Sequence, residues 1–291
     1  MNSVSVVVPN YNHAAFLQRR LDSVYGQSFT DIEVIILDDC SNDESRSIIE
    51  PFRSHPKTKC ILYNDQNSGS TFRQWEKGIQ QCSSEYIWLA ESDDFAHRDF
   101  LSTLMKEMIH SEDLGLVYCQ SMGIDAADRM LGSWKNYTDD LDRNFFAGDF
   151  KVDGRIFIEK YLIHKNCIPN ASAVLFRKKH YEEAGGAETI IRNCGDWILW
   201  MKLLMSCQVA FVSRTLNYFR QHPNSVIALA NRHYDYERYL ERHDRTMRQK
   251  FQDFLEEKYI EQIKILKLNY HYISIKNMDE ETFLEQNRVS A

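Results

Sequence analysis

Acidic residues follow two apolar stretches of this sequence and together could hold a cation. Residues 86–90 are apolar and are followed at once by ESDD at 91–94, and the apolar residues 32–37 are followed by DD at 38–39. Short apolar runs with polar ends are typical of buried strands in a parallel sheet, and ligands bind at the carboxyl ends of such strands. Carboxylates gathered there repel one another and lose hydration. A divalent cation that shares its coordination sphere with a diphosphate would offset both costs.

A third apolar run, residues 4–9, ends in a turn that carries an aromatic side chain. Tyr11 can stack on a base, and Asp39 can accept a hydrogen bond from a base N–H or a ribose hydroxyl. Asp93 and Asp94 can contact the ribose and bind a metal ion. Each of these acids alone could be a helix cap, but their occurrence at successive strand ends favours a binding site.

The elements that must position these groups alternate between strand and helix. The pattern predicts strands at residues 4–9, 32–37, 60–63 and 86–90, and helices around 16–24, 44–52, 72–79 and 99–110. Such alternation is typical of an α/β protein with a doubly wound, mostly parallel sheet and right-handed crossovers.

The second half of the chain has a less regular pattern. It predicts strands at 114–119, 171–176, 209–212 and 216–219, helices at 156–163 and 197–205, and a long loop at 132–153 over the carboxyl edge. We therefore expect one domain at 1–227, with a nucleotide-binding half to about residue 119 and an acceptor half from about residue 120.

The sequence from about residue 228 to 291 is charged and rich in tyrosine, and predicts a C-terminal helical extension with a frayed tail. Its apolar stripe comprises Met247, Phe251, Phe254, Leu255, Ile263 and Leu266. We expect this stripe to pack on the main domain or on the partner subunit of a homo-oligomer, in preference to a membrane.

Composition narrows the class of protein. With 291 residues, 43% hydrophobic content and a net charge of −7, the chain can form a large core and is not expected to bind nucleic acid. Its seven cysteines lack zinc-ligand spacing, which favours reduced thiols. The start lacks a signal-peptide pattern, and no stretch has the length of a membrane span. We expect a cytoplasmic protein that contacts a membrane at most peripherally.

Four stretches resemble family-2 glycosyltransferases of the GT-A fold, and they occur in the same order: VSVVVPNYNHAAFLQRRLDSVYGQSF, IEVIILDDCSND, NSGSTFRQWEKGI and EYIWLAESDDF. The resemblance covers residues 4–110 and resumes more loosely at 171–176, 194–197 and 218–222. It implies a Rossmann-like GT-A fold and a metal-dependent inverting transferase that uses Mn²⁺ or Mg²⁺. It also implies a nucleotide-sugar donor, a UDP-sugar, and a saccharide or lipid-linked saccharide acceptor, as in bacterial polysaccharide synthesis at the cytoplasmic face of a membrane.

The resemblance also implies roles for individual residues. Pro9, Tyr11 and Asp39 would contact the nucleobase or ribose, Arg73 would lie beside the nucleotide, and Asp93 and Asp94 would form the metal motif. That motif is often Asp-x-Asp, and Glu91 occupies its first position here. Which of the three carboxylates touches the metal is therefore left open.

Residues near the end of the main domain complete the expected site. Gly195-Asp196-Trp197 resembles the family's acid-Asp-aromatic motif, whose Asp is the general base that takes a proton from the acceptor hydroxyl. Asp196 could instead cap the helix that follows, or do both. Gly195 stands where an acid usually helps to hold the acceptor. His222 could be a third metal ligand, a diphosphate contact or a structural residue.

Other readings compete with the transferase. Gly195 is the sole support for a catalytically inactive sugar-nucleotide-binding protein. A nucleotidyltransferase would need a glycine-rich basic loop after the first strand, and a nicotinamide dehydrogenase would need GxGxxG there; this chain has PNYN instead. His13 and Arg98 are assigned to the surface.

Overall fold

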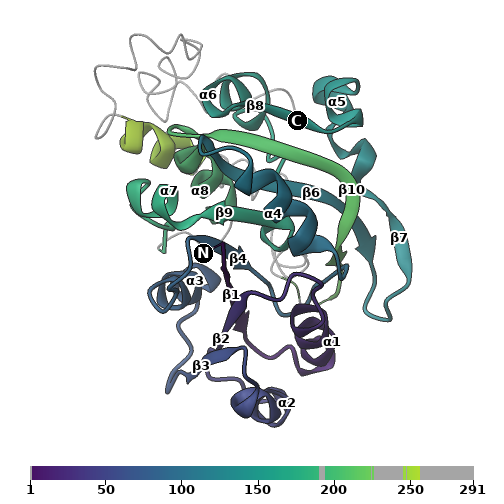
Figure 1. Ribbon diagram of the computed structural model, residues 1–291, viewed down its shortest axis with the longest axis vertical. Coiled ribbons are helices and arrows are strands. Elements are labelled where there is room, and N and C mark those ends of the chain that lie inside the picture. Colours follow the sequence, from purple (N-terminus) through teal and green to yellow (C-terminus); the bar gives the residue numbers. More distant parts are fainter. Residues whose placement is uncertain (1, 190–193, 224, 226–244, 247, 256–291) are drawn as a thin grey trace, which may run out of the picture.

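The structure is a computed structural model that describes residues 2–189, 194–223, 225, 245–246 and 248–255. Within these residues a ten-stranded sheet forms the centre, in the order β3-β2-β1-β4-β9-β6-β10-β5, with β7 paired to β6 and β8 to β10 (Figure 1). The strands are β1 (Val4–Asn10), β2 (Ile32–Asp38), β3 (Thr58–Tyr63), β4 (Tyr86–Leu89), β5 (Phe95–Ala96), β6 (Leu114–Ile124), β7 (Met130–Ser133), β8 (Phe150–Asp153), β9 (Val174–Arg177) and β10 (Gln208–Arg220).

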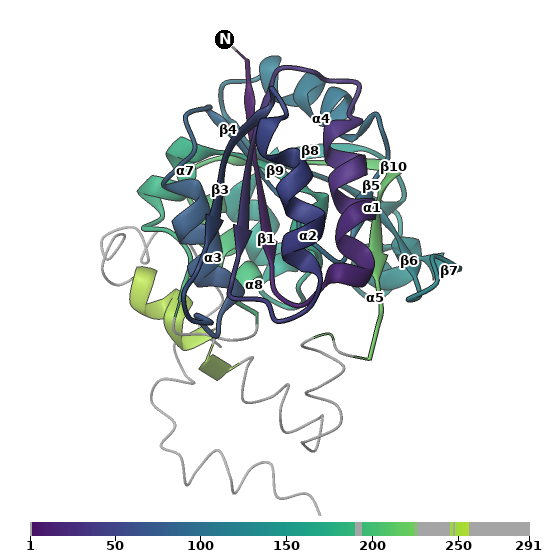
Figure 2. The same cartoon turned by 90° about the horizontal axis from the view of Figure 1, so that it is seen from below.

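Helices cover both faces of this sheet (Figures 1 and 2). They are α1 (Ala14–Tyr25), α2 (Ser45–Ile49), α3 (Thr71–Ile79), α4 (Phe100–Ile109), α5 (Asp139–Asp142), α6 (Gly154–Phe157), α7 (Lys178–Glu183) and α8 (Gly195–Leu204). Alternate residues of β1 point to opposite faces, so that Val7 packs in one core with α3 and α8, and Val6 and Val8 pack in the other with α1, α2 and α4. The predicted α/β class, with helices on both faces of a central sheet, is confirmed.

The strands of the first half follow the prediction closely. β1 pairs in parallel with β2 and β4, and β2 pairs in parallel with β3. β1 and β4 are buried throughout, as expected of apolar runs without alternation. The helix expected at 44–52 is shorter: α2 changes at Glu50 to a 3₁₀-helix, Glu50–Ser54, because Pro51 has no N–H to continue the α-helical ladder.

In the second half several strands pair in antiparallel orientation, which the sequence did not predict. β9 runs antiparallel to β4 and β6, and the first part of the strand expected at 171–176 is a 3₁₀ turn, Ala171–Ala173. The two strands expected at 209–212 and 216–219 are one strand, β10, which pairs in parallel with β6. The polar residues Ser213 and Arg214 lie exposed at a register shift, so the expected break is a bulge.

The segment at 132–153 is not the extended loop that the sequence predicted. It contains α5, β8 and two 3₁₀-helices, Trp134–Thr138 and Phe145–Ala147. Aromatic rings hold these short elements together: Phe145 stacks on Phe150 with 4.1 Å between centroids and on Tyr161 with 4.7 Å. Contacts between rings from different elements leave no helical or strand period in the sequence, which explains the wrong prediction.

The C-terminal extension is described only in part. Residues 245–246 and 248–255 are helical, and Phe251, Phe254 and Leu255 are buried in the same core as α8. The Lys202 ammonium lies 5.5 Å from the centroid of the Phe254 ring. These three residues of the apolar stripe pack on the main domain, as expected. The rest of the predicted extension, including Met247, Ile263 and Leu266, lies outside the described residues.

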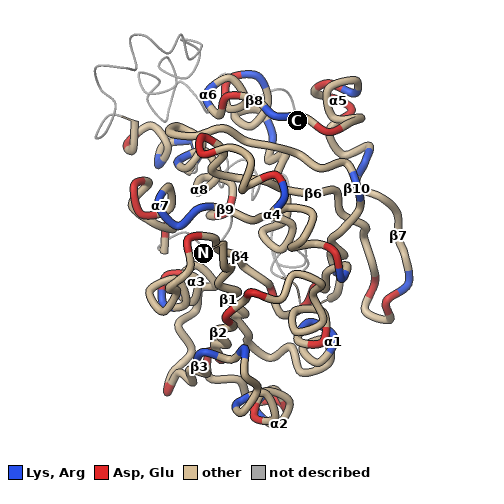
Figure 3. The backbone as a smooth tube through the Cα atoms, viewed as in Figure 1, with Lys and Arg blue, Asp and Glu red and all other residues tan. Residues whose placement is uncertain are grey.

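Other bulk features can be read from the same described residues. All seven cysteine thiols are free. Lys and Arg are interspersed with Asp and Glu along the elements (Figure 3). None of the helices in the described ranges has both the length and the apolar character needed to cross a lipid bilayer.

Candidate active site

The turns that follow β1, β2 and β4 are in contact at the carboxyl edge of the sheet. Asn12 donates its backbone N–H to Ser41 Oγ (2.9 Å), and its side-chain oxygen accepts the backbone N–H of Asn42 (2.8 Å). His13 Nδ1 lies 2.8 Å from Ser92 Oγ. The parallel register thus brings the three predicted strand ends together at one edge, where ligands bind in open α/β sheets.

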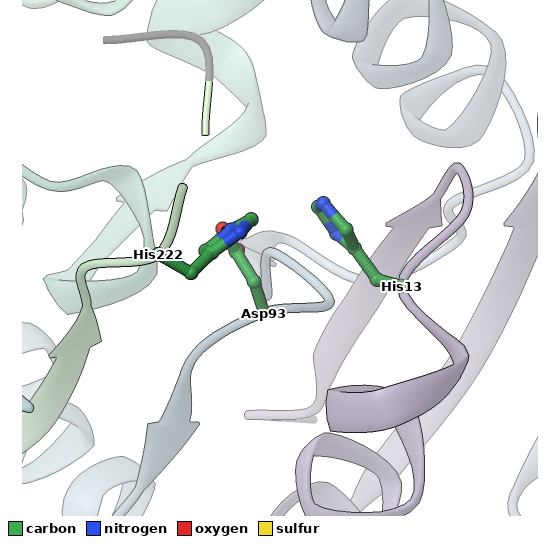
Figure 4. A group of neighbouring side chains, drawn as sticks. All are labelled: His13, Asp93 and His222. Atoms are coloured by element: carbon green, nitrogen blue, oxygen red, sulfur yellow. The ribbon is translucent and has the colours of Figure 1, made fainter. Parts of the chain in front are cut away.

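Two histidines meet Asp93 at this edge (Figure 4). His222 Nε2 lies 3.1 Å from Asp93 Oδ2, and the His13 and His222 rings meet edge to face with 5.3 Å between centroids. One potential ligand atom of each residue lies within 4.8 Å of the other two. The three side chains come from the turns after β1, β4 and β10, so that residues far apart in the sequence form one group.

Burial and neighbouring charges shift the pKa values of Asp93 and His13 in opposite directions. Burial would raise the pKa of Asp93, but the hydrogen bond from His222 and the nearby His13 lower it below its usual value. Burial lowers the pKa of His13, and the charge of Asp93 only partly opposes this. A charged carboxylate and a neutral imidazole are the forms that bind metal ions.

Asp94, the other residue of the expected metal motif, turns into the protein. Its Oδ1 accepts the backbone N–H of Arg220 (2.9 Å), and its Oδ2 lies 3.9 Å from the buried guanidinium of Arg20. Arg220 also donates from Nε to the backbone oxygen of Asp93 (2.6 Å). Burial and the charge of Asp93 raise the pKa of Asp94. In this structure Asp94 shapes the turn and does not join the group of Asp93 and the two histidines.

Glu91 points toward α3. Trp75 Nε1 donates to Glu91 Oε1 (2.6 Å), and the Thr71 hydroxyl lies 3.4 Å from Oε2. The backbone N–H of Glu91 donates to Ser172 Oγ (3.1 Å). Burial and the charge of Asp93 raise the pKa of Glu91 to about 8. The protonated form of this side chain is therefore favoured at neutral pH.

Asp39 is enclosed by neutral hydrogen-bond donors. The two carboxylate oxygens accept from Asn64 Nδ2 (2.6 Å), Asn67 Nδ2 (3.3 Å), the Ser68 N–H (2.9 Å), the Ser68 hydroxyl (2.7 Å) and Gln74 Nε2 (3.0 Å). A carboxylate has about four lone-pair sites, so these donors fill its capacity. Asp39 therefore fixes the segment between β3 and α3.

The other predicted nucleotide contacts differ in their accessibility. Pro9 is buried within β1. Tyr11 is 44% exposed at the end of that strand. Arg73 is exposed on α3, with Nη1 3.4 Å from the backbone oxygen of Ser68 in the segment that Asp39 fixes. Arg98 is exposed, as expected, whereas His13 is not the surface residue that we expected.

Asp196 lies in the first turn of α8, where the helix dipole favours a negative charge. Asn166 Nδ2 lies 3.3 Å from Asp196 Oδ2. Burial raises the pKa of Asp196 to about 6, against the opposing effect of hydrogen bonds from the Trp197 backbone and from Asn166. The Trp197 indole donates to the backbone oxygen of Leu162 (2.6 Å) and is buried, so this ring belongs to the core and is not a sugar platform.

Packing explains the glycine before Asp196. A Cβ at Gly195 would lie 2.5 Å from the ring of Phe72. Phe72 packs edge to face on Trp75, whose indole binds Glu91. This chain of contacts links the first turn of α8 to the acidic turn after β4, so that Asp196 borders the same edge of the sheet.

Sequence reasoning missed three residues of the site. His13 follows the turn after the first strand, and this position in the sequence could have identified it as a site residue. Arg20 lies three residues after Leu17 on the buried face of α1, and an arginine on an apolar helix face needs an acidic partner. Arg220 gave no local signal, because its partners lie more than 90 residues away in the sequence.

A hollow of about 760 Å³ opens elsewhere on the described surface. Its lining includes Glu85, Asp113 and Gln208, which lie at the amino ends of their strands. Arg177 in this hollow already donates to the backbone oxygens of Leu114 and Met108. The hollow is thus at the opposite edge from the acidic turns and is not the site described above.

Comparison with known proteins identifies relatives of this chain. Residues 5–165 match the family described as "Glycosyl transferase family 2". Glycosyltransferase GlyG of Streptococcus pneumoniae is 27% identical over 194 residues, which cover 67% of this chain and 51% of GlyG. Poly(ribitol-phosphate) beta-N-acetylglucosaminyltransferase TarS of Staphylococcus aureus is 31% identical over 103 residues, which cover 35% of this chain and 18% of TarS. The chain thus spans about half or less of the length of these curated relatives.

A solved structure has the same fold. A fragment of S. aureus TarS in complex with UDP-GlcNAc superposes with a TM-score of 0.64 at 16% identity, covering 88% of this chain and 73% of the fragment. The same fragment in complex with UDP gives a TM-score of 0.61 and covers 98% of this chain and 78% of the fragment.

Proposed function

Because the chain belongs to glycosyl transferase family 2 and has the GT-A fold, we propose that it transfers a sugar, with inversion, from a UDP-sugar to a saccharide or lipid-linked saccharide. The observation that carries this proposal is the meeting of Asp93, His13 and His222 beside the turns after β1 and β2. TarS, named as an N-acetylglucosaminyltransferase and solved in complex with UDP-GlcNAc, supports the donor class.

The donor set of this group fits a divalent cation. Asp93 supplies a carboxylate oxygen, and His13 and His222 supply imidazole nitrogens. Imidazole suits transition-metal ions and carboxylate suits Mn²⁺ and Mg²⁺, so the mixed set favours Mn²⁺ over Mg²⁺. A cation bound there would neutralise the charge that builds on the departing diphosphate. In place of the expected Asp94, we propose His13 as the third ligand.

The nucleotide would lie on the neighbouring turns. Tyr11 is exposed at the end of β1 and can stack on the base, and the exposed Arg73 can reach the nucleotide from α3. Asp39 would contribute to nucleotide binding through the segment that it fixes, since protein donors fill its oxygens. Pro9 would contribute through the backbone at the end of β1.

Asp196 would act as the general base. A carboxyl group with a pKa of about 6 is mostly ionised at neutral pH and can still take a proton from the acceptor hydroxyl as the new bond forms. Gly195 was the only support for an inactive binding protein, and the Phe72 ring accounts for it by packing. The transferase is therefore the function that the geometry supports best.

A thermal-shift panel tests the donor and the metal together. We expect UDP-sugars, but not GDP- or dTDP-sugars, to raise the melting temperature, and to do so only with Mn²⁺ present. Asp196→Asn should keep this donor-induced shift and lose transfer, by about 100-fold or more, the range of general-base catalysis. Transfer by Asp196→Asn at the parent rate would reject the base assignment.

A further inference from the structure

Among the described residues, the side-chain nitrogen of Asn166 has a hydrogen-bond partner and its side-chain oxygen has none. Its nitrogen lies 3.3 Å from Asp196 Oδ2. Its oxygen is buried and has no hydrogen-bond partner in the described structure. The orientation of the amide follows from the carboxylate, because the opposite orientation would place two oxygens against each other. Asn166 therefore faces Asp196 as a donor.

The segment that carries Asn166 also holds the acidic turn after β4. Four residues later, Asn170 accepts the backbone N–H of Ser172 (2.8 Å). The Ser172 hydroxyl binds the Glu91 N–H (3.1 Å) and the guanidinium of Arg20 (3.0 Å). A single short stretch of chain thus connects Asp196 with the turn that carries Asp93.

We propose that Asn166 is the positioning residue of Asp196: its N–H holds the carboxylate in the orientation that meets the acceptor hydroxyl. This inference rests on the proposed role of Asp196 as the base. Asn166 acts through Asp196 and is not itself a catalytic residue.

The hydrogen bond from Asn166 favours the charged carboxylate, whereas burial disfavours it. Removal of the bond should therefore raise the pKa of Asp196. In Asn166→Asp a second carboxyl group would face that of Asp196, which should raise the pKa of Asp196 further. Exposed Asn144 offers a matched control, because Asn144→Asp makes the same chemical change away from Asp196.

The direct measurement is a pH titration of the Asp196 carboxyl carbon by ¹³C NMR, with Asp196→Asn used to assign the signal. We expect the Asp196 pKa to rise in Asn166→Ala, to rise more in Asn166→Asp and to stay unchanged in Asn144→Asp. An unchanged pKa in folded Asn166→Ala would overturn the proposal. If Asn166→Ala does not fold, the isosteric Asn166→Asp replaces it, and an unchanged Asp196 pKa in that variant would overturn the proposal.

A second measurement follows UDP release from UDP-GlcNAc with MnCl₂, with water in place of the acceptor. We expect kcat to fall by about 10- to 100-fold in Asn166→Ala, the effect of a lost hydrogen bond to a charged group, with the donor KM unchanged. The acid limb of kcat should move to higher pH. A fall confined to donor KM would overturn the positioning role.

The outcomes separate this inference from the proposed function. If Asp196→Asn releases UDP at the parent rate, the base assignment itself fails. If Asp196→Asn is inactive while Asn166→Ala keeps the parent rate and pH profile, only the role of Asn166 fails.

Discussion

The turns after β2 and β4 are neighbours at one edge of the sheet, and both carry paired acids, but the two pairs have different surroundings. In the turn after β2, Asp39 accepts hydrogen bonds from side-chain amides, a hydroxyl and a backbone N–H, all of them neutral. In the turn after β4, Asp93 faces two imidazoles, and Asp94 faces the guanidinium of Arg20 and accepts the backbone N–H of Arg220. The same pattern in the sequence thus leads to two kinds of site.

The two turns differ in how fully the protein hydrogen-bonds the carboxylate of each. The donors around Asp39 saturate its oxygens, so its charge is stabilised without any ligand. Among the described side chains, His222 donates a hydrogen bond to Asp93, and the ring of His13 lies close by. Two imidazoles and a carboxylate that converge on one point are the ligand set that we propose for a divalent cation. Protein donors satisfy the acid of the first turn, and the second turn is the one for which we propose a bound cation.

Asp93→Ala should produce the largest effect. It removes the one carboxylate of the group and leaves two imidazoles that cannot neutralise a cation. We expect Mn²⁺ affinity, measured by isothermal titration calorimetry, to fall by more than about 100-fold, beyond the effect of a lost outer-shell partner. Metal-dependent binding of UDP should be lost with it. His13→Ala and His222→Ala should each weaken Mn²⁺ binding less than Asp93→Ala.

Arg98→Ala is the control for this series, because Arg98 is exposed and lies outside the group. It should keep the parent affinity for Mn²⁺. Binding of Mn²⁺ to Asp93→Ala with parent affinity would remove the contrast between the two turns.

Asp39→Ala should act on stability instead of metal binding. It leaves the donors of Asn64, Ser68 and Gln74 without their acceptor, and Gln74 is buried. We expect the free energy of unfolding, from urea denaturation, to fall by about 2–4 kcal/mol, because one buried donor and two half-buried residues lose their partner at once. Mn²⁺ affinity should stay at the parent value.

A matched experiment on Asp93→Ala sharpens this prediction. Loss of a buried charge that awaits a cation should leave the metal-free free energy of unfolding near the parent value. Equal losses of stability in Asp39→Ala and Asp93→Ala would show that both turns are structural, and the comparison would fail.

The sequence was sufficient to predict where these turns lie. The strands at 4–9, 32–37 and 86–90 are uniform apolar runs with polar ends, and both features are local in the sequence. Parallel pairing then placed their ends at one edge. The order of the first four strands and of the α-helices between them was predictable for the same reason, whereas the two-residue strand β5 was not.

The sequence could not predict what each acid contacts. Arg220 reaches Asp94 across 126 positions, and His222 reaches Asp93 across 129. No local pattern records such pairs. The antiparallel insertion of β9 between β4 and β6 and the aromatic packing at 145–161 also depend on distant partners. These are the regions where the predicted elements were wrong.

Glu91→Gln should give the smallest effect and separates Glu91 from Asp93 within one turn. Glutamine keeps an oxygen to accept from Trp75 Nε1 but cannot ionise. Burial and Asp93 raise the pKa of Glu91 from 4.5 to about 8. In the unfolded chain Glu91 ionises near pH 4.5, whereas the folded protein keeps the proton until about pH 8. The parent should therefore lose stability relative to Glu91→Gln as the pH rises across this window.

Urea unfolding in buffer with EDTA, at pH 5.5 and pH 8.5, measures this difference. We expect Glu91→Gln to be close to the parent at pH 5.5 and more stable by about 1–2 kcal/mol at pH 8.5, a value reduced for the partial exposure of the side chain. Glu112→Gln, on an exposed residue, controls for the general effect of removing an acid. A constant gap at both pH values would mean that Glu91 is ionised throughout. Glu91 would then be a third charged carboxylate available to the cation, and the turn after β4 would differ from that after β2 in more than its two histidines.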